Sequence, residues 1–559
     1  MLHRASTRVP AAIAAAVAIC TGCQSTAPKP EVQFYPGFGN YHVEVTTGSE
    51  EAQRWFDQGI QLLYGFNHDE AIRSFARAAE IDPGCAMAWW GISYAHGLHI
   101  NNPEMTEAQS KAGYEAAQSA LAALDNETPL EHALVDAVAT RYTWPAPEGR
   151  THLDEAYADA MEEVWRTFPN NPDVGALYAE SLMDLQPWDL WTRDGQPKGR
   201  TTEIVQVLER VLELDPNHPG ANHFYIHAVE ASPTPERALA AADRLGALVP
   251  GSGHLVHMPS HIYIRVGRYP DAADTNARAI EVDRAYFEMA PEPEFYGLYF
   301  VHNIHFLTYA AMMECRYETA IAAARDLERD VPPAFLEKHT KFADGFMPTA
   351  RHVMIRFGKW DDVLAEPEPP RWRLISRAMH HYARGVAYAA TNRPNEARVE
   401  LAAFNRVARE IPEDWQIGQN NATAVIPVAR KLLIGEIQFR EGDYDDAFAT
   451  LRDGVVLESR LVYDEPPGWM QPVRHALGAL LMSASRFEEA EAVYRADLVV
   501  YPGNGWAMLG LENALRAQGK GRSAEVRRLA SDRARAWRRA DVKPTSSCYC
   551  EPGGWASVD

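Results

Sequence analysis

The chain has 559 residues, with 54 basic and 76 acidic side chains and a formal net charge of −22 at pH 7. This acidity argues against a protein that binds nucleic acid or an anionic membrane surface, because either would need a basic footprint. Apolar residues make up 46 % of the chain, too many for a disordered protein, and the length predicts three or four compact domains or a repeat array.

The first 23 residues have the layout of a secretory signal peptide. A basic start and a short apolar run precede the small residues of 21–23, and this end resembles a bacterial lipobox, although Cys20 stands where Leu is usual. The resemblance implies that Cys23 is the lipidated N-terminus of the mature protein. The alternative is an ordinary cleaved signal peptide without lipid.

Export is therefore expected, to the periplasmic side of the outer membrane as a lipoprotein or to the periplasm or extracellular space, with membrane contact only through the lipid. Residues 24–50 have the composition of a linker, and residues 541–559 that of a loosely ordered tail. Cys548 and Cys550 in this tail could pair or bind a soft metal. The few remaining cysteines exclude a disulfide scaffold.

Residues 51–540 carry a 34-residue repeat. The first unit, 52–85, has marker residues at positions 4, 8, 20, 24, 27 and 32, namely Trp55, Gly59, Ala71, Phe75, Ala78 and Pro83. This spacing resembles the tetratricopeptide repeat (TPR), a helical hairpin that cannot bury its apolar face alone. The resemblance implies an all-α, right-handed TPR-type solenoid of about eleven hairpins, with His-rich central units at about 172–355 and C-terminal units at about 378–540.

Two insertions interrupt the period, at residues 97–106 and 186–200. Loops of this length inside a compact array are often functional. Most TPR solenoids bind a peptide or protein on their concave face, so the default expectation is an interaction scaffold, and fold alone adds nothing more.

Histidines recur in register in three consecutive units, which begin at residues 219, 253 and 301. The resemblance implies that positions 2, 5 and 9 of each unit face the concave groove, and seven of these nine positions are histidine. They are His223, His227, His254, His257, His261, His302 and His305. Position 9 of the flanking units adds Glu180 and His352, position 9 of the third unit is Tyr309, and position 12 of the first is Glu230.

This pattern predicts a transition-metal site. His223 and His227 are four residues apart, so they share one helix face, and His257 and His261 repeat this spacing on the next unit. Neighbouring helices lie 8–10 Å apart, so their imidazoles can converge on one ion. Clustered neutral imidazoles suit Cu or Zn, with Fe as a further candidate, and the number of ligands allows one or two ions. The alternatives are ordinary packing and a metal-free groove for an anionic ligand.

Other groove residues are candidates for further roles. Glu180 or Glu230 could act as a general base, and Tyr309 would take part in oxygen chemistry at a copper or iron site. Four residues are candidates to bind substrate: Trp188, Trp191, Arg265 and Arg351. His96, His99, His380, His381 and His475 lie off the groove register or far from the cluster, and packing is the preferred interpretation.

Five strings resemble a family of bacterial TPR proteins: NHPGANHFYIHAVEAS (217–232), GHLVHMPSHIYIRVGRY (253–269), HNIHFL (302–307), PWDLW (187–191) and YDEPPGW (463–469). This resemblance implies the fold and the His-rich groove and brings no activity with it. The YDEPPGW loop is expected to close the far end of the solenoid.

Two functions follow from these features. The first is a metal-dependent enzyme, a hydrolase or an oxidoreductase, acting on a small or peptide-like ligand held in the groove. The second is a non-catalytic lipoprotein of the cell envelope, either a scaffold for protein or peptide or a metal carrier. The chain has no Walker A, GxGxxG, GxSxG or HExxH motif, so it offers no phosphate loop, dinucleotide fold, serine-hydrolase elbow or zincin helix.

Overall fold

The computed structural model describes residues 32–290 and 294–550. This part of the chain is helical, apart from one short hairpin of β1 (Gln416–Ile417) and β2 (Asn420–Asn421). None of its helices is both long and apolar enough to cross a membrane. The expected signal peptide and Cys23 lie outside the described residues.

The helices follow one another with short connections. Those of the N-terminal part are α1 (Glu50–Tyr64), α2 (His68–Ile81), α3 (Ala86–Ala95), α4 (Glu107–Ala123), α5 (Pro129–Ala139), α6 (Thr151–Thr167), α7 (Pro172–Met183) and α8 (Thr201–Leu214). The central part has α9 (Pro219–Glu230), η1 (Pro235–Ala238), α10 (Leu239–Leu248), α11 (Gly253–His257), α12 (Pro259–Arg265), α13 (Tyr269–Met289), η2 (Glu294–Tyr296), α14 (Gly297–Met313), α15 (Tyr317–Asp330), α16 (Pro333–Lys338), α17 (Thr340–Ala343), α18 (Thr349–Arg356) and α19 (Trp360–Ala365). The C-terminal part has α20 (Leu374–Ala390), α21 (Pro394–Ala408), α22 (Ala422–Glu441), α23 (Tyr444–Glu458), α24 (Val473–Ser483), α25 (Phe487–Val500), α26 (Gly505–Leu515), η3 (Arg516–Lys520) and α27 (Ala524–Ala536).

Consecutive helices pack as antiparallel pairs, and glycine lets them approach closely. A Cβ atom built on Gly59 or Gly91 would lie 2.5 or 2.6 Å from the Phe75 ring, so α1 and α3 both press on this side chain of α2. Gly478 and Gly510 flank Tyr494 of α25 in the same way. The predicted all-α solenoid of stacked hairpins is therefore confirmed.

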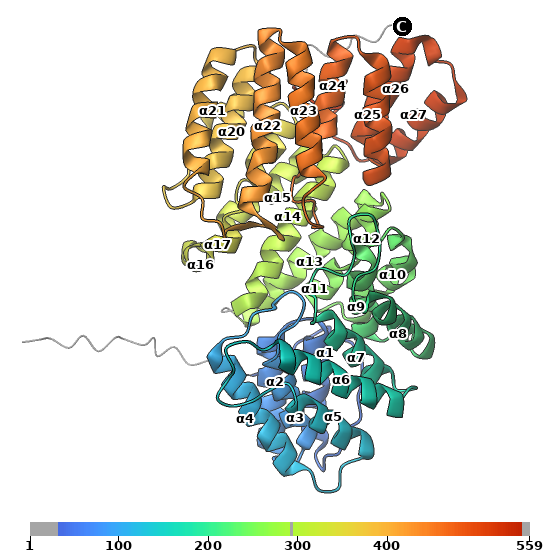
Figure 1. The fold of residues 1–559 in the computed structure, drawn as a ribbon. Helices are drawn as coiled ribbons and strands as arrows, with labels where there is room; N and C mark the ends of the chain where they lie inside the picture. The colour runs from blue at the N-terminus through green and yellow to red at the C-terminus, as the bar shows by residue number, and fades with distance from the viewer. Residues whose placement is uncertain (1–31, 291–293, 551–559) are drawn as a thin grey trace, which may run out of the picture.

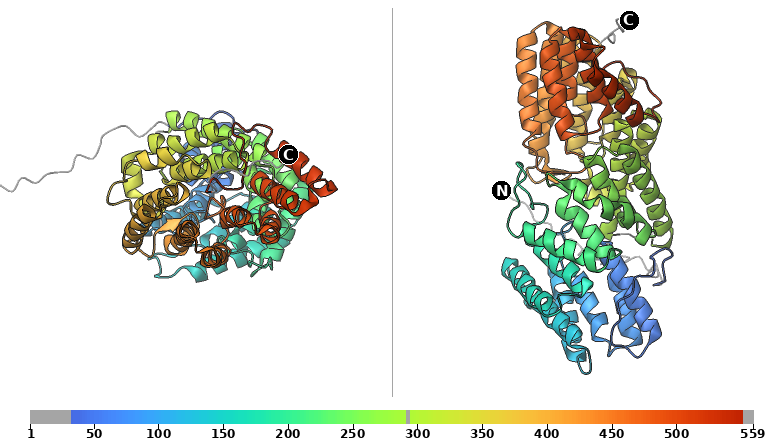
Figure 2. Two further views of the ribbon diagram at one scale, coloured as in Figure 1. Left: turned by 90° about the horizontal axis from the view of Figure 1, so that it is seen from above. Right: turned by 90° about the vertical axis from the view of Figure 1, so that its right-hand side faces the viewer.

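The solenoid winds into a superhelix with two stacked lobes (Figures 1 and 2). Helices α1–α8 form one end of the molecule and α20–α27 the other, with α9–α15 between them. Viewed from above, the C-terminal helices come back beside the central ones (Figure 2, left). Segments that are far apart in the sequence are therefore neighbours in the middle of the molecule.

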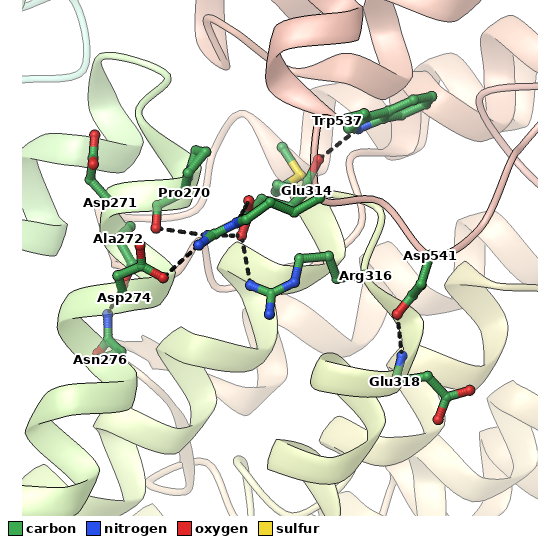
Figure 3. A network of polar contacts seen from close by, with 12 residues as sticks. Pro270, Asp271, Ala272, Asp274, Asn276, Glu314, Arg316, Glu318, Trp537 and Asp541 are labelled. Carbon is green, nitrogen blue, oxygen red and sulfur yellow. Dashed lines mark hydrogen bonds and ion pairs between the residues drawn. The ribbon is translucent and has the colours of Figure 1, made fainter.

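The C-terminal helices are attached to α14 by hydrogen bonds (Figure 3). The indole Nε1 of Trp506 donates to the carbonyl of Met312 at 2.9 Å, and that of Trp537 donates to the carbonyl of Met313 at 3.0 Å. The Asp541 carboxylate accepts the backbone N–H of Tyr317 at 2.7 Å and so caps the start of α15. These contacts close the superhelix.

Two segments expected to be loose are packed. Residues 32–49, part of the expected linker, bury Tyr35 and Phe38, and the Gly251 N–H donates to the Gly37 carbonyl at 2.7 Å. In the tail, Cys548 and Cys550 form a disulfide, and the Ser547 hydroxyl donates to the His475 carbonyl at 2.8 Å. Composition alone gave no sign of either, because the buried surfaces belong to repeats far away in the sequence.

Candidate metal centre

Four central helices carry the histidines to one place. Helix α9 supplies His223 and His227, the broken pair α11 and α12 supplies His254, His257 and His261, and α14 supplies His302. Proline at 259 begins α12 and separates it from α11, since its ring cannot donate a backbone N–H. His257 and His261 still lie one helical turn apart across this break, so their side chains share one face.

The six side chains form two clusters, each with its ligand nitrogens within 4.8 Å of one another. Cluster A consists of His223, His227 and His254, and cluster B consists of His257, His261 and His302. In cluster A the Nε2 atoms of His223 and His254 face each other at 3.1 Å. In cluster B the Nε2 atoms of His257 and His261 face each other at 2.8 Å.

Fixed acceptors determine which nitrogen of the central imidazoles carries the proton. The Nδ1 of His223 lies 2.7 Å from the Tyr64 carbonyl, which can only accept, so Nδ1 is protonated and Nε2 has a free lone pair. His257 has the same arrangement with the Asn276 Oδ1 at 2.7 Å. The Asn276 amide is held in this orientation because its Nδ2 donates to the Ala272 carbonyl at 2.7 Å.

Glu230 connects the two clusters. One of its carboxylate oxygens accepts from His227 Nδ1 at 3.0 Å, and the other lies 2.7 Å from His261 Nδ1. The Nε2 of His227 is buried and has no hydrogen-bond partner. Carboxylates behind metal-binding imidazoles are a common arrangement, because they fix the tautomer and make the free nitrogen more basic.

Burial keeps these imidazoles neutral. It lowers the pKa of His223, His254, His257 and His302 well below the usual value, and the neighbouring imidazoles lower it further. Burial also acts to raise the pKa of Glu230, but its contacts with the His261 and His227 rings outweigh this effect and bring the pKa to about 2. The imidazoles of His223, His254, His257 and His302 are therefore neutral nitrogen donors near an ionised Glu230 carboxylate, and metal binding requires this protonation state.

Glu465 is a part of this centre that the sequence did not predict. It lies on the loop between α23 and α24, and its Oε2 is 3.3 Å from His261 Nδ1. The side chain is 2 % exposed, and neither carboxylate oxygen has a hydrogen-bond partner. Burial and the charge of Glu230 raise its pKa well above the usual value. The signal in the sequence was the YDEPPGW loop, which was expected only to close the solenoid.

Three of the four predicted substrate residues border the clusters. The Trp188 ring meets His227 edge-on at 5.5 Å, and its Nε1 donates to Asn101 Oδ1 at 3.1 Å. Trp191 Nε1 donates to the Ala228 carbonyl at 2.8 Å, which ties it to the end of α9. Arg265 donates to the Glu230 carbonyl, so its guanidinium is already engaged. Trp188 thus has the best position to contact a ligand.

Other predicted residues lie elsewhere. Glu180 accepts the Tyr94 hydroxyl and belongs to a separate buried network with Arg141. Tyr309 is buried beside Tyr269, with ring centres 6.5 Å apart. Arg351 donates to the Pro367 carbonyl at 2.8 Å. Of the position-9 residues, only His227 and His261 belong to the clusters, whereas Glu180, Tyr309 and His352 have other neighbours.

His305 and His352, the last two predicted ligands, line a different cavity. His305 packs on Phe346 at 5.1 Å and His352 packs on Trp469 at 5.3 Å. Burial lowers the pKa of His305 to about 3 and that of His352 to about 4. Of the eight predicted ligands, six therefore form the two clusters.

His99, which was assigned to packing, lies at the edge of cluster A. Its ring stacks on Phe66 at 4.3 Å and lies 4.5 Å from His68. Burial lowers its pKa well below the usual value, and the neighbouring imidazoles of His68 and His223 lower it further. The sequence feature that could have indicated this position is its place in the first insertion, residues 97–106.

The cavity beside the two clusters is small. It measures about 20 Å³, room for about one water molecule. Its walls come from both insertions, from α9 and from the loop before α24: Ile100, Met183, Trp188, Leu190, His227, Glu230, Ala231 and Tyr463. The three loops that interrupt the repeat therefore cover the centre.

No protein-family model and no curated protein sequence matches the chain. Among solved structures, it is similar to a human IFIT1 dimer with m7Gppp-AAAA, at 12 % identity and a TM-score of 0.32, covering 89 % of this chain and 92 % of that one. It is also similar to yeast Tom70, at 10 % identity and a TM-score of 0.28, covering 87 % and 92 %. Likeness at this level carries no inference about ligand or activity.

Proposed function

We propose that the chain is a metalloprotein whose solenoid encloses one or two transition-metal ions, one at cluster A and one at cluster B. The observation that carries this proposal is the two pairs of Nε2 atoms that face each other at 3.1 and 2.8 Å. Two nitrogens on one tetrahedral zinc ion, each about 2.0–2.1 Å from the metal, lie about 3.4 Å apart, so each pair needs to open only slightly.

With a neutral His261, cluster B without a metal contains a buried repulsion. If His261 Nε2 carries the proton and donates it to His257, then His261 Nδ1 turns a lone pair toward the Glu230 carboxylate at 2.7 Å. If Nδ1 carries the proton instead, two Nε2 lone pairs face each other. A cation between the two Nε2 atoms removes this repulsion, as would a second proton on His261, and metal analysis distinguishes the two.

The donor set favours Zn or Cu, with Fe as a third candidate, because all six cluster residues are imidazoles. As an enzyme, the protein would be a metal-dependent hydrolase or oxidoreductase. The buried histidines and the small cavity of about 20 Å³ beside them favour a small substrate over a peptide. Trp188 would form its wall, and Glu230 would fix His227 and His261 as ligands.

A second candidate is a metal carrier or a scaffold stabilised by its ion. The same burial favours it, because three loops cover the centre and an ion held there would exchange slowly. Turnover assays on the metal-loaded protein distinguish the two, since a carrier would show no reaction at any pH.

Elemental analysis tests the metal proposal. We expect purified wild-type protein, after metal add-back, to hold one or two ions per chain, and the double substitution His227→Ala/His261→Ala to lose them with unchanged helical circular dichroism. His152→Ala, at an exposed position, is the matched control and should keep the full metal content. Wild-type protein that stays metal-free after add-back would exclude the proposal.

Export with a lipid on Cys23 is the accompanying proposal for location, and it rests on the lipobox-like residues 19–23. Cys23→Ser should release the protein from the membrane fraction of the producing bacterium, whereas Cys20→Ser should not. Unchanged membrane attachment of the Cys23 variant would contradict the proposal.

A further inference from the structure

The loop between α23 and α24 reaches cluster B from the opposite lobe. Glu465 follows His261 by 204 positions in the chain, yet its carboxylate lies 3.3 Å from the His261 ring. Beside it, Tyr463 places its ring under the Arg265 guanidinium at 5.3 Å. The C-terminal lobe therefore contacts the end of α12 directly.

Hydrogen bonds at both ends hold this loop in place. Asp464 accepts the Gln419 N–H at 2.9 Å, and Asn420 exchanges two hydrogen bonds with the backbone of Val462, at 2.8 and 3.2 Å. At the other end, Gln471 Nε2 donates to the His352 carbonyl at 2.7 Å. These hydrogen bonds hold the loop, and with it the Glu465 carboxylate, in a fixed position.

The Glu465 carboxyl group accepts no hydrogen bond within the described residues. It is buried, both oxygens lack hydrogen-bond partners, and a second carboxylate, Glu230, contacts the same His261 nitrogen. Two buried carboxyl groups on the Nδ1 side of His261 leave Nε2 as the nitrogen that faces the other cluster B histidines.

A second connection runs through α13. Asp274 of this helix pairs with Arg539 of the C-terminal segment at 2.7 Å (Figure 3). Two residues later, Asn276 holds the Nδ1 of His257. The backbones also meet between Gly267 and Gly503, where a Cβ on Gly267 would lie 2.9 Å from the Gly503 Cα. Helix α13 therefore contributes both to the closure of the superhelix and to the orientation of His257 in cluster B.

We infer that Glu465 is a positioning residue for cluster B, and that metal binding at this cluster is coupled to closure of the C-terminal lobe on the central helices. The inference rests on the proposed metal centre. Glu465 and Glu230 both lie beside His261 Nδ1, so that His261 Nε2 faces the ion. Because coupling is reciprocal, a bound ion at cluster B also holds the lobe closed.

The test uses the full chain with Glu465→Gln, which keeps the shape and removes the charge. We expect Zn²⁺ binding at cluster B, measured by competition with a chelator, to weaken about 10–100-fold, as is typical for a lost carboxylate behind a ligand. Cluster A should keep its affinity. With Co²⁺ as a probe, only one of the two sets of d–d absorption bands should change.

Glu458→Gln is the matched control, since Glu458 is a buried glutamate just before the same loop and does not contact the clusters. It should bind both ions like the wild type. If Glu465→Gln fails to fold, Gln471→Ala decides, because it loosens the loop without changing the carboxylate. A cluster B affinity at least three-fold weaker then supports the inference, and an unchanged affinity overturns it.

Hydrogen exchange measures the coupling. Zn²⁺ at cluster B should slow exchange of the Tyr317 and Glu318 amides, which Asp541 caps across the lobe boundary at 2.7 and 3.0 Å. If the wild type binds two ions and Glu465→Gln binds both with the same affinity, the inference is overturned and the proposed function stands. A wild type that binds no metal refutes the proposed function itself.

Discussion

At the scale of single residues, the centre is made by buried polar groups that hold one another in orientation. Three acceptors lie beside histidine Nδ1 atoms: Tyr64, Asn276 and Glu230. Tyr64 and Asn276 lie on other helices than the histidines they contact. Glu230 shares a helix with His227 but not with His261. The candidate ligands were visible in the sequence because they repeat in register. Their acceptors were not, apart from Glu230, because a carbonyl or a lone asparagine has no pattern.

Asn276→Leu is expected to weaken metal binding at cluster B about 10–100-fold, because His257 loses the acceptor that fixes its tautomer. Binding at cluster A should be unchanged, since His223 uses the Tyr64 carbonyl. Zn²⁺ titration against a chelator measures both. Asn222→Leu is the control, as Asn222 is equally buried and bonds only backbone carbonyls and Arg244. An equal loss of cluster B affinity in the two variants would show that the affinity depends on packing around the site and not on the orientation of the His257 ring.

Glu458→Gln should stabilise the protein at alkaline pH. Burial raises the pKa of Glu458 from its ordinary 4.5 to about 8, so the folded state prefers the neutral form. Wild-type stability from this group is fully present below pH 4.5 and is lost as the pH rises through about 8. Above pH 8 the variant should gain about 1–3 kcal/mol, since glutamine avoids a buried, poorly paired charge.

Thermal unfolding followed at pH 5 and pH 9 measures this effect. The variant and the wild type should unfold at similar temperatures at pH 5, and the variant should unfold at the higher temperature at pH 9. A variant that loses equal stability at both values would mean that the Val473 N–H, which Glu458 accepts at 3.2 Å, is the more important contact.

At the scale of elements, the repeat and its interruptions have different roles. Regular hairpins stack through small residues, whereas the two insertions and the loop before α24 leave the stack and cover the centre. Trp188 of the second insertion has a left-handed φ of 60°, a conformation that bulky residues rarely adopt. It is held there by contacts with both Asn101 and the His227 ring.

Gly59→Ala should destabilise the first hairpin by about 1–3 kcal/mol, because an added methyl group overlaps the Phe75 ring in a close-packed interior. The added Cβ would lie 2.5 Å from a ring carbon. Thermal unfolding measures the loss, and Gly149→Ala is the control, since no atom lies within 4 Å of its Cβ position. Equal unfolding temperatures for the two variants would refute close packing at this position.

At the scale of the whole molecule, closure of the superhelix brings the two lobes together around the centre. Arg539 makes several of the closing contacts: it donates to the buried Glu314 at 2.8 and 2.7 Å and to the Pro270 carbonyl at 3.0 Å. A chain of hairpins with only neighbour contacts would be open and flexible. These long-range contacts make the solenoid one closed body (Figure 2).

Arg539→Gln should therefore loosen the C-terminal lobe, at a cost of about 1–3 kcal/mol for leaving Glu314 with one fewer partner. Hydrogen exchange should accelerate at the amides of Tyr317 and Glu318, because their cap, Asp541, lies two residues further along the same segment. Arg535→Gln is the control, since Arg535 is an exposed residue paired only with its own helix. Unchanged exchange in the Arg539 variant would show that other contacts suffice for closure.

The sequence by itself determined the repeat, the helical class and the in-register histidines, because the 34-residue period and the one-face spacing are local properties of the chain. Six of the eight histidines predicted as ligands lie together in one region. The tertiary structure alone decided that they divide into two clusters, that His305 and His352 lie apart, and that Glu465 joins from the other lobe. The physical reason is the superhelical turn between hairpins: small rotations add up over many repeats, and no local pattern records which distant segments they finally bring together.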